Sequence, residues 1–149
     1  MMSIRRMLET DLDAVERIAT ESSPDAATWT RHHLLAMLAN PSLYEAWVAE
    51  QAGAVVGFLY FHFVGEEAEL DNLAVSPAWR RRGIAAELLE TAWQRATERA
   101  HAAMFLEVRR SNTAALRLYQ RAGFLNVGVR TSYYTNPSED AIQLVRKRL

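Results

Sequence analysis

Two side chains that can donate or accept protons lie twelve residues apart in the second half of the chain. Glu107 stands near the end of a nearly apolar run, and Tyr119 lies inside the segment 112–124. A carboxylate beside a buried strand is costly unless it is paired, hydrogen-bonded or functional. From the pattern alone, Glu107 is either a proton acceptor or the ion-pair partner of Arg109 or Arg110. Tyr119 is either a proton donor or an aromatic residue of the core.

A basic loop followed by a glycine and a helical pattern has the composition of an anion site. The loop contains Arg80, Arg81 and Arg82, and Gly83 opens the helical pattern. The first N–H groups of a helix lack intrahelical partners and carry partial positive charge. A glycine at that point lets an anion approach the backbone closely. The pattern therefore predicts a cradle for a pyrophosphate, with a solvated basic loop as the alternative interpretation.

Other polar and aromatic residues have a weaker claim to a site. Tyr133 and Tyr134 lie in the predicted polar loop 131–140, where they either clamp a peptide or are simply exposed. The acidic turn 66–69 holds three glutamates, which are interpreted as solvated rather than as a site that attracts a basic peptide. His62, on a predicted strand, is interpreted as a structural histidine rather than a site residue.

These residues are positioned by a succession of strands and helices. Hydrophobic periods of two and of three to four residues separate the two kinds of element. Hairpins lead into a strand–helix–strand unit, so the fold class is α/β (α+β) with a mixed sheet of about seven strands and about four helices. The predicted strands span 3–8, 43–51, 54–64, 69–75, 103–108, 124–130 and 141–148. The first predicted helix begins at Thr10, which can cap it, and ends before Pro24. The other predicted helices span 29–40, 83–100 and 112–122.

Composition narrows the class of protein. The 149 residues fit one domain spanning 1–149, and a hydrophobic share of 50% is that of a globular protein. Seventeen Lys and Arg against 18 Asp and Glu leave a net charge of -1, which argues against direct nucleic-acid binding through bulk charge. The absence of cysteine excludes disulfides, thiolate metal sites and an acyl-cysteine intermediate.

Neither a signal peptide nor a membrane span is predicted. The longest apolar stretch, Ala54–Val64, is far shorter than the roughly 20 residues that a spanning helix needs. The arginines near the N-terminus are not followed by an apolar run. We expect a cytoplasmic protein without a membrane partner, present as a monomer or weak dimer and holding no metal.

The segment around the basic loop resembles the acetyl-CoA signature of the GNAT N-acetyltransferase superfamily. Asn72-Leu-Ala-Val75 and Pro77 precede Arg80-x-x-Gly83-x-Ala85, which matches Arg/Gln-x-x-Gly-x-Gly/Ala. The resemblance implies the GNAT fold, with strands 69–75 and 103–108 splayed around acetyl-CoA and the pantetheine arm paired to the first of them. The cofactor-binding residues that it implies are Leu73, Ala74, Val75, Arg80, Arg81, Arg82, Gly83, Ile84, Ala85, Ala86, Asn112 and Tyr119.

The segment from Phe105 to Phe124 resembles, more narrowly, the RimI group of ribosomal-protein-alanine N-acetyltransferases. The segments 129–134 and 139–142 match that group too, as does a tryptophan like Trp29 at the start of the second predicted helix. The resemblance implies that Glu107 is the general base and Tyr119 the general acid, and that Tyr133 and Tyr134 border the peptide groove. It also implies that the acceptor is the N-terminal α-amine of a small-subunit ribosomal protein.

These roles fit direct acetyl transfer in a ternary complex. An α-amine with a pKa near ~8 must lose a proton before it attacks a thioester, and Glu107 could take that proton through a water. Tyr119, with an ordinary pKa of about 10, can protonate the departing thiolate, and an N–H near Val75 is a candidate oxyanion donor. Two alternatives are a GNAT enzyme that acetylates a small amine or a lysine side chain, and a non-catalytic acyl-CoA-binding regulatory module.

Overall fold

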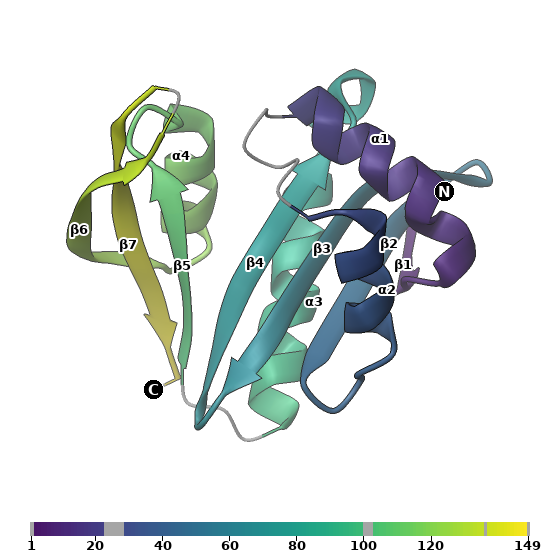
Figure 1. The fold of residues 1–149 in the computed structure, drawn as a ribbon, viewed down its shortest axis with the longest axis horizontal. Helices are drawn as coiled ribbons and strands as arrows, with labels where there is room; N and C mark the ends of the chain where they lie inside the picture. The colour runs from purple at the N-terminus through teal and green to yellow at the C-terminus, as the bar shows by residue number, and fades with distance from the viewer. Residues whose placement is uncertain (1, 23–28, 100–102, 136, 149) are drawn as a thin grey trace.

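A mixed seven-stranded sheet, in the order β1-β2-β3-β4-β5-β7-β6, forms the centre of the fold (Figure 1). The computed structural model describes residues 2–22, 29–99, 103–135 and 137–148. The strands are β1 (Met2–Arg6), β2 (Tyr44–Gln51), β3 (Ala54–Val64), β4 (Glu67–Val75), β5 (Ala103–Arg109), β6 (Leu125–Tyr134) and β7 (Glu139–Lys147). The helices are α1 (Leu12–Ser22), α2 (Arg31–Leu38), α3 (Ile84–Glu98) and α4 (Thr113–Arg121).

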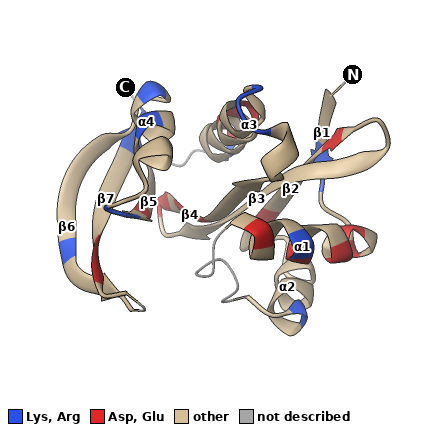
Figure 2. Ribbon diagram, turned by 90° about the horizontal axis from the view of Figure 1, so that it is seen from above, with Lys and Arg blue, Asp and Glu red and all other residues tan. Residues whose placement is uncertain are grey.

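The helices cover both faces of the sheet. Helices α1 and α2 lie on one face, and α3 and α4 lie on the other (Figure 2). Alternation along the strands sends side chains to two separate hydrophobic cores. On β3, for example, Phe58 and Tyr60 pack in the core under α1 and α2, whereas Leu59 and Phe61 pack in the core under α3 and α4.

Strands β4 and β5 are the parallel pair that the strand–helix–strand pattern predicts, and they separate after a short contact. Their register pairs Glu67 with Ala103, Ala68 with Met104 and Glu69 with Phe105. Both strands then continue beyond the last pair without pairing to each other (Figure 1). We call the point that follows the Glu69–Phe105 pair the β4/β5 fork. It leaves one edge of β4 open as far as Val75.

The acidic turn predicted at 66–69 is largely strand. Strand β4 begins at Glu67, so Glu67 and Glu69 belong to it and only Glu66 lies in the turn. The interpretation of all three glutamates as a solvated turn is therefore wrong for Glu69. Its carboxylate faces His62 on the neighbouring strand, at 3.3 Å from Nε2.

The polar loop predicted at 131–140 is mostly strand as well. Strand β6 runs on to Tyr134, so Tyr133 and Tyr134 lie at a strand end and not in a loop. The pairing of β6 with β7 is irregular in this stretch, and Ser132 has a φ of 53°. Such an irregularity breaks the alternation by which a strand is recognised in sequence, and this explains the wrong prediction.

The first helix is capped differently from the prediction. A short 3₁₀ helix (Glu9–Asp11) precedes α1, and Asp11 Oδ2 accepts a hydrogen bond from Leu8 N at 2.7 Å. The same carboxylate takes two hydrogen bonds from Arg5, at 2.8 and 2.9 Å. Asp11, rather than Thr10, therefore fixes the start of this helix. Among the described residues, no helix is long and apolar enough to span a membrane.

Candidate active site

The open edge of β4 presents backbone polar groups toward the fork. Ser76 N donates to Val56 O of the neighbouring chain segment at 2.8 Å. Because hydrogen-bonded and non-hydrogen-bonded residues alternate in an antiparallel pair, the backbone N–H and C=O groups of Leu73 and Val75 point away from β3. The peptide group of Ala74 consequently turns toward β3. Leu73 N already donates to the side-chain Oδ1 of Asn72 at 2.9 Å. The edge therefore offers the N–H of Val75 and the carbonyl groups of Leu73 and Val75 to an extended partner.

The N-terminus of α3 lies at the end of this edge. Gly83 is its N-cap with φ 80° and ψ 8°, a left-handed conformation that glycine adopts without strain. The first backbone bond of the helix is from Glu87 N to Gly83 O at 3.1 Å, which leaves the N–H groups of Ile84, Ala85 and Ala86 without a helical partner. A Cβ on Gly57 would lie 3.2 Å from Ala74 O and 3.4 Å from Ile84 Cγ2, so this glycine lets α3 approach the sheet. The geometry is that of an anion site.

The three arginines of the loop before α3 take different directions. Arg80 Nε donates to Val75 O at 3.3 Å, and the Arg82 guanidinium lies 4.6 Å from the centre of the Trp79 ring. Arg81 is exposed and has a φ of 64°. Figure 2 shows this basic loop (blue) where the chain enters α3. Positive charge therefore surrounds the helix start, although the side chains do not converge on one point.

Glu107 lies on β5 beyond the fork, on the face of the sheet that α1 and α2 cover. Its neighbours Leu106 and Val108 point to the opposite core, so alternation directs Glu107 away from them. Its carboxylate is 13% exposed, and Arg130 Nε lies 3.1 Å from Oε2. That contact lacks hydrogen-bond geometry, so the buried Oε2 has no hydrogen-bond partner among the described residues. Burial raises the pKa of Glu107, the Arg130 charge lowers it, and the Glu69 charge raises it, with a net rise.

The ion pairs suggested for Glu107 by sequence alone are not formed. Arg109 pairs with Glu139 at 3.0 Å, and Arg110 pairs with Asp140 at 3.4 Å. The partner of Glu107 is Arg130, which sequence analysis missed. No local signal could identify Arg130, because the contact crosses β7 and depends on the register of two pairs of strands.

Tyr119 lies on α4, on the opposite face of the sheet from Glu107. It is buried among core residues, and its ring centre lies 5.8 Å from that of Phe124. Burial raises the pKa of its hydroxyl above the ordinary value, and the Tyr134 hydroxyl adds to the rise. Tyr119 therefore satisfies the core interpretation and also keeps its proton at neutral pH. No hydrogen bond joins it to Glu107 in the described part of the chain, so the two groups border the fork from opposite sides.

The two tyrosines at the end of β6 lie next to Glu107 and its partner. Their rings contact each other edge to face, with centres 5.1 Å apart. Arg130 lies 5.3 Å from the ring centre of Tyr133, and Arg109 lies 4.4 Å from that of Tyr134. Tyr133 is half exposed, as a residue that contacts a bound peptide must be. The structure thus brings Tyr133 to the ion pair of Arg130 and Glu107, whereas Tyr134 contacts Arg109 and acts on the pKa of Tyr119.

Asn112 caps α4 at the end of β5. Its Oδ1 accepts from Ala115 N at 3.1 Å, which leaves its amide Nδ2 to act as a donor. Glu139 secures the turn before this cap, accepting from Ser111 N at 2.6 Å and from Arg109 Nη1 at 3.0 Å. Asn112 therefore has a structural role, and its free amide group still allows the predicted contact with a CoA arm.

The chain was compared with known protein families and solved structures. Residues 8–124 match the model of the acetyltransferase (GNAT) family. The ribosomal protein bS18-alanine N-acetyltransferase of Escherichia coli K12 is 34% identical over 144 residues, which cover 95% of each chain.

Solved structures of N-acetyltransferases also align with this chain. The crystal structure of the ribosomal-protein-S18-alanine N-acetyltransferase from Escherichia coli aligns with a TM-score of 0.88 and 32% identity, covering 99% of this chain and 94% of the other. The PaiA N-acetyltransferase of Thermoplasma acidophilum, in complex with coenzyme A, aligns with a TM-score of 0.85 and 20% identity, covering 99% of both chains. At that identity, the second alignment bears on the fold alone.

Proposed function

Because the chain belongs to the acetyltransferase (GNAT) family, we propose that it acetylates the α-amine of an N-terminal alanine on a small-subunit ribosomal protein. It is an acyltransferase that forms an N-acetyl group, like its named relatives. The observation that carries the reaction is the buried, unbonded oxygen of Glu107 beside the open edge of β4. The alanine acceptor rests on the likeness to the Escherichia coli enzyme along almost the whole chain.

Acetyl-CoA is the proposed acetyl donor. The open edge of β4 at Leu73 and Val75 suits the amide groups of an extended pantetheine arm. The free N–H groups of Ile84, Ala85 and Ala86 suit its pyrophosphate. The positive charges of Arg80, Arg81 and Arg82 add long-range attraction, while Asn112 Nδ2 and Tyr119 lie on the α4 side of the fork. Two of the cofactor-binding positions predicted from the sequence have other roles in this proposal: Gly83 caps α3, and the backbone N–H and C=O of Ala74 face β3.

In the proposed mechanism the proton acceptor and the proton donor lie on opposite faces of the sheet. Glu107 takes a proton from the α-ammonium, and its raised pKa makes it a stronger base than an ordinary glutamate. The N–H of Val75 points into the fork and is the proposed oxyanion donor. Tyr119, which stays protonated at neutral pH, delivers its proton to the departing thiolate sulfur. Tyr133 and Tyr134 border the path of the peptide on the Glu107 side.

The test is the release of CoA from acetyl-CoA in the presence of two peptides. One peptide carries the alanine-first N-terminus of the ribosomal protein, and the other is identical except that its α-amine is blocked. We expect release only with the free amine. Equal rates with both peptides would overturn the proposal, and binding of acetyl-CoA without release would favour a regulatory module.

The proposal also gives the setting of the reaction. An enzyme that modifies a ribosomal protein works where ribosomes are assembled, so we place it in the cytoplasm. We propose that one chain acts as a monomer or weak dimer, because the residues of the site come from the sheet, the start of α3 and α4 of the same chain. We also propose that the reaction needs no metal and no contact with nucleic acid.

A further inference from the structure

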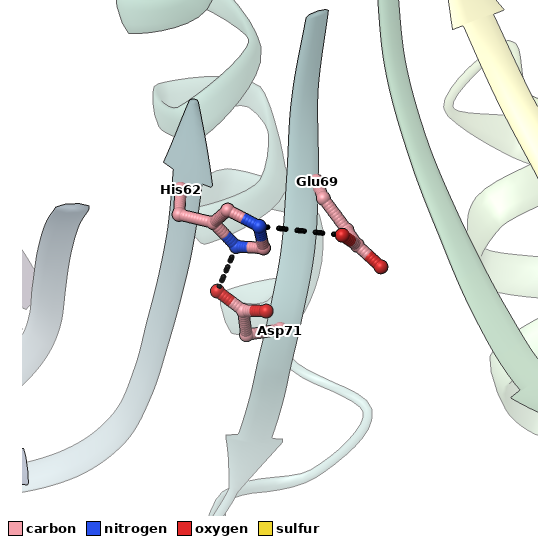
Figure 3. Close-up of side chains that lie close together, drawn as sticks. All are labelled: His62, Glu69 and Asp71. Carbon is pink, nitrogen blue, oxygen red and sulfur yellow. Dashed lines mark hydrogen bonds and ion pairs between the residues drawn. The ribbon is translucent and has the colours of Figure 1, made fainter. Parts of the chain in front are cut away.

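Three ionisable side chains form a cluster on β3 and β4 that the mechanism above does not use. The His62 imidazole lies between two carboxylates, with Nδ1 2.8 Å from Asp71 Oδ2 and Nε2 3.3 Å from Glu69 Oε2 (Figure 3). We call these three residues the His62 cluster. Their side chains are 14–31% exposed, so the cluster is in contact with solvent.

A β-bulge in β4 helps to gather this cluster on one face. The β3–β4 register pairs Phe61 with Leu70 and Tyr60 with Asn72, which leaves Asp71 as the extra residue. A bulge interrupts alternation, so two successive side chains can point to the same face. Asp71 accordingly contacts His62, and Asn72 Nδ2 donates to the Tyr60 hydroxyl at 3.3 Å on the α1/α2 side of the sheet.

Glu69 connects the cluster to the candidate base. It is the last residue of β4 that pairs with β5, opposite Phe105, and Glu107 lies two residues further along β5 on the same face. Figure 3 shows the Glu69 carboxylate extending from β4 toward β5. The negative charge of Glu69 also acts on Glu107 and raises its pKa. Glu107, Glu69 and His62 therefore lie in succession on one face of the sheet, with Glu69 and His62 both partly exposed to solvent.

The reaction creates a need for such a series. As the new C–N bond forms and the C–S bond breaks, an ammonium nitrogen loses two protons to become an amide. One proton ends on the thiol sulfur, by way of Tyr119. The other is left on Glu107 and must reach solvent before the next turnover. The buried Oε2 of Glu107 has no hydrogen-bond partner in the described residues through which to pass it on directly.

We propose that Glu69 carries this second proton from Glu107 to His62, which releases it to solvent, while Asp71 holds the imidazole in position. The proposal rests on the proposed function, because it assumes that Glu107 is the base. His62 acts through Glu107 and is a positioning and relay residue. Burial raises the pKa of Asp71 to about 6, and the hydrogen bond and charge of His62 oppose that rise.

Other groups that face the cluster are compatible with this role. Tyr44 on β2 packs against His62, with ring centres 5.5 Å apart. Arg130 forms its ion pair with Glu107, at 3.1 Å. The three ligand-type atoms lie within 4.8 Å of one another, as in a metal site. However, Nδ1 of the imidazole faces Asp71 and Nε2 faces Glu69. A metal ion bound to one of these nitrogens would need both carboxylates on the side of that nitrogen.

The experiment measures CoA release with the free-amine peptide, across pH, for the wild type and three variants. His62→Ala should lower kcat about tenfold or more with an unchanged KM for acetyl-CoA, and added imidazole should restore part of the lost rate. His62→Gln fills the same space but carries no proton, so it should lose as much kcat. His32→Ala removes an exposed histidine on α2 and should match the wild type with and without imidazole.

The outcomes separate the relay from the proposed function. No turnover by the wild type would overturn both. Wild-type turnover with an unchanged kcat in His62→Gln would overturn the relay alone, as would a loss in His62→Ala that imidazole does not relieve. Loss of wild-type activity on chelation, restored by a divalent cation, would also overturn the relay and assign the cluster to a metal.

Discussion

At the scale of single residues, Glu107 shows how neighbours set the basicity of a carboxylate. Burial and the negative charge of Glu69 favour its protonated form, whereas Arg130 favours the ionised form. The net rise in pKa means that Glu107 holds a proton more firmly than an exposed glutamate does, which suits its proposed role as the base. On the other side of the fork, burial in the core raises the pKa of Tyr119, which therefore stays protonated.

Removal of either group should affect chemistry and not binding. Glu107→Gln should lower kcat about 100-fold, the order expected for a lost general base, and Tyr119→Phe should also lower it. Neither change should alter the dissociation constant of acetyl-CoA by more than about twofold, because neither group holds the pyrophosphate. Steady-state kinetics and calorimetric titration test this. Unchanged turnover in both variants would refute the role assignment.

Arg130 should set the pH at which activity is lost on the acid side. Arg130→Met removes the charge that lowers the pKa of Glu107, so that pKa should rise further. Glu107 is active when ionised, so the acid limb of kcat/KM should move to higher pH, while the rate at high pH stays the same. Arg130→Lys keeps the charge and should shift the limb less. A pH–rate profile that is identical in all three proteins would contradict the prediction.

At the scale of elements, the start of α3 and the cap of α4 have structural roles and also carry the groups proposed to bind acetyl-CoA. The left-handed glycine before α3 leaves three helix N–H groups without partners, and the cap of α4 leaves one amide donor free. In both places the residue that caps the helix also leaves hydrogen-bond donors free for the proposed ligand. Matched substitutions can separate the two requirements.

Gly83→Val should weaken acetyl-CoA binding. The cost is one of backbone conformation, roughly 1–2 kcal/mol at a positive φ, because no atom lies within 4 Å of an added Cβ. Gly53→Val is the control, since Gly53 has the same φ of +80° and the same open surroundings but lies in the β2–β3 turn. Thermal melting should show a similar loss in both variants, and KM for acetyl-CoA should rise only in Gly83→Val. If KM stayed constant there, the cradle would be wrong.

Asn112 offers a similar comparison. Asn112→Ala removes the cap of α4 and should cost about 1 kcal/mol of unfolding free energy. Asn112→Asp keeps the oxygen that accepts from Ala115 N but removes the amide donor, so it should retain stability and still raise KM for acetyl-CoA. Denaturant unfolding and KM measurements on both variants test this. A wild-type KM in both would leave Asn112 as a cap only.

At the scale of the whole molecule, Glu45 on β2 links three elements, because its carboxylate contacts Arg95 on α3 and Arg6 on β1. Its carboxylate is 1% exposed, receives hydrogen bonds from Arg95 at 3.0 Å to each oxygen, and lies 3.7 Å from Arg6. Burial would raise its pKa, but Arg95, Arg6 and Trp47 together outweigh that effect and hold the pKa below its usual value. The network holds the last turn of α3 against β2.

Acid should therefore destabilise the fold through Glu45. A carboxyl group whose pKa is lower in the folded state stabilises the protein above its unfolded pKa, and the contribution is lost as the pH falls through the folded pKa. Glu45→Gln should cost about 3 kcal/mol at pH 7 and flatten the decline of stability below pH ~4.5. Urea unfolding at several pH values measures both effects. Glu66→Gln, an exposed control, should change neither, and a Glu45→Gln profile parallel to the wild type would contradict this account.

Local patterns in the sequence predicted most of the fold and part of the site. Helix and strand periodicity predicted the strands and the order of the elements, and the basic loop before a helical pattern identified the glycine before α3. They did so because each signal lies within a few consecutive residues. Glu107 and Tyr119 were identified by chemical type and by a motif that runs through adjacent positions, and their catalytic roles remain predictions. The predicted start of β4 was wrong because its glutamates have the composition of a solvated turn, although they pair regularly with β3. The predicted end of β6 was wrong because irregular pairing disturbs the alternation on which strand prediction depends.

The tertiary structure decided the contacts between distant strands. Arg130 meets Glu107 only because β7 pairs with β5 on one side and β6 on the other. His62 meets Asp71 only because β3 pairs with β4 in a register that includes a bulge. A one-residue change in either register would turn these side chains to the other face. The sequence alone thus predicted the family and the residues proposed for its chemistry, and the strand registers decided which charges act on Glu107.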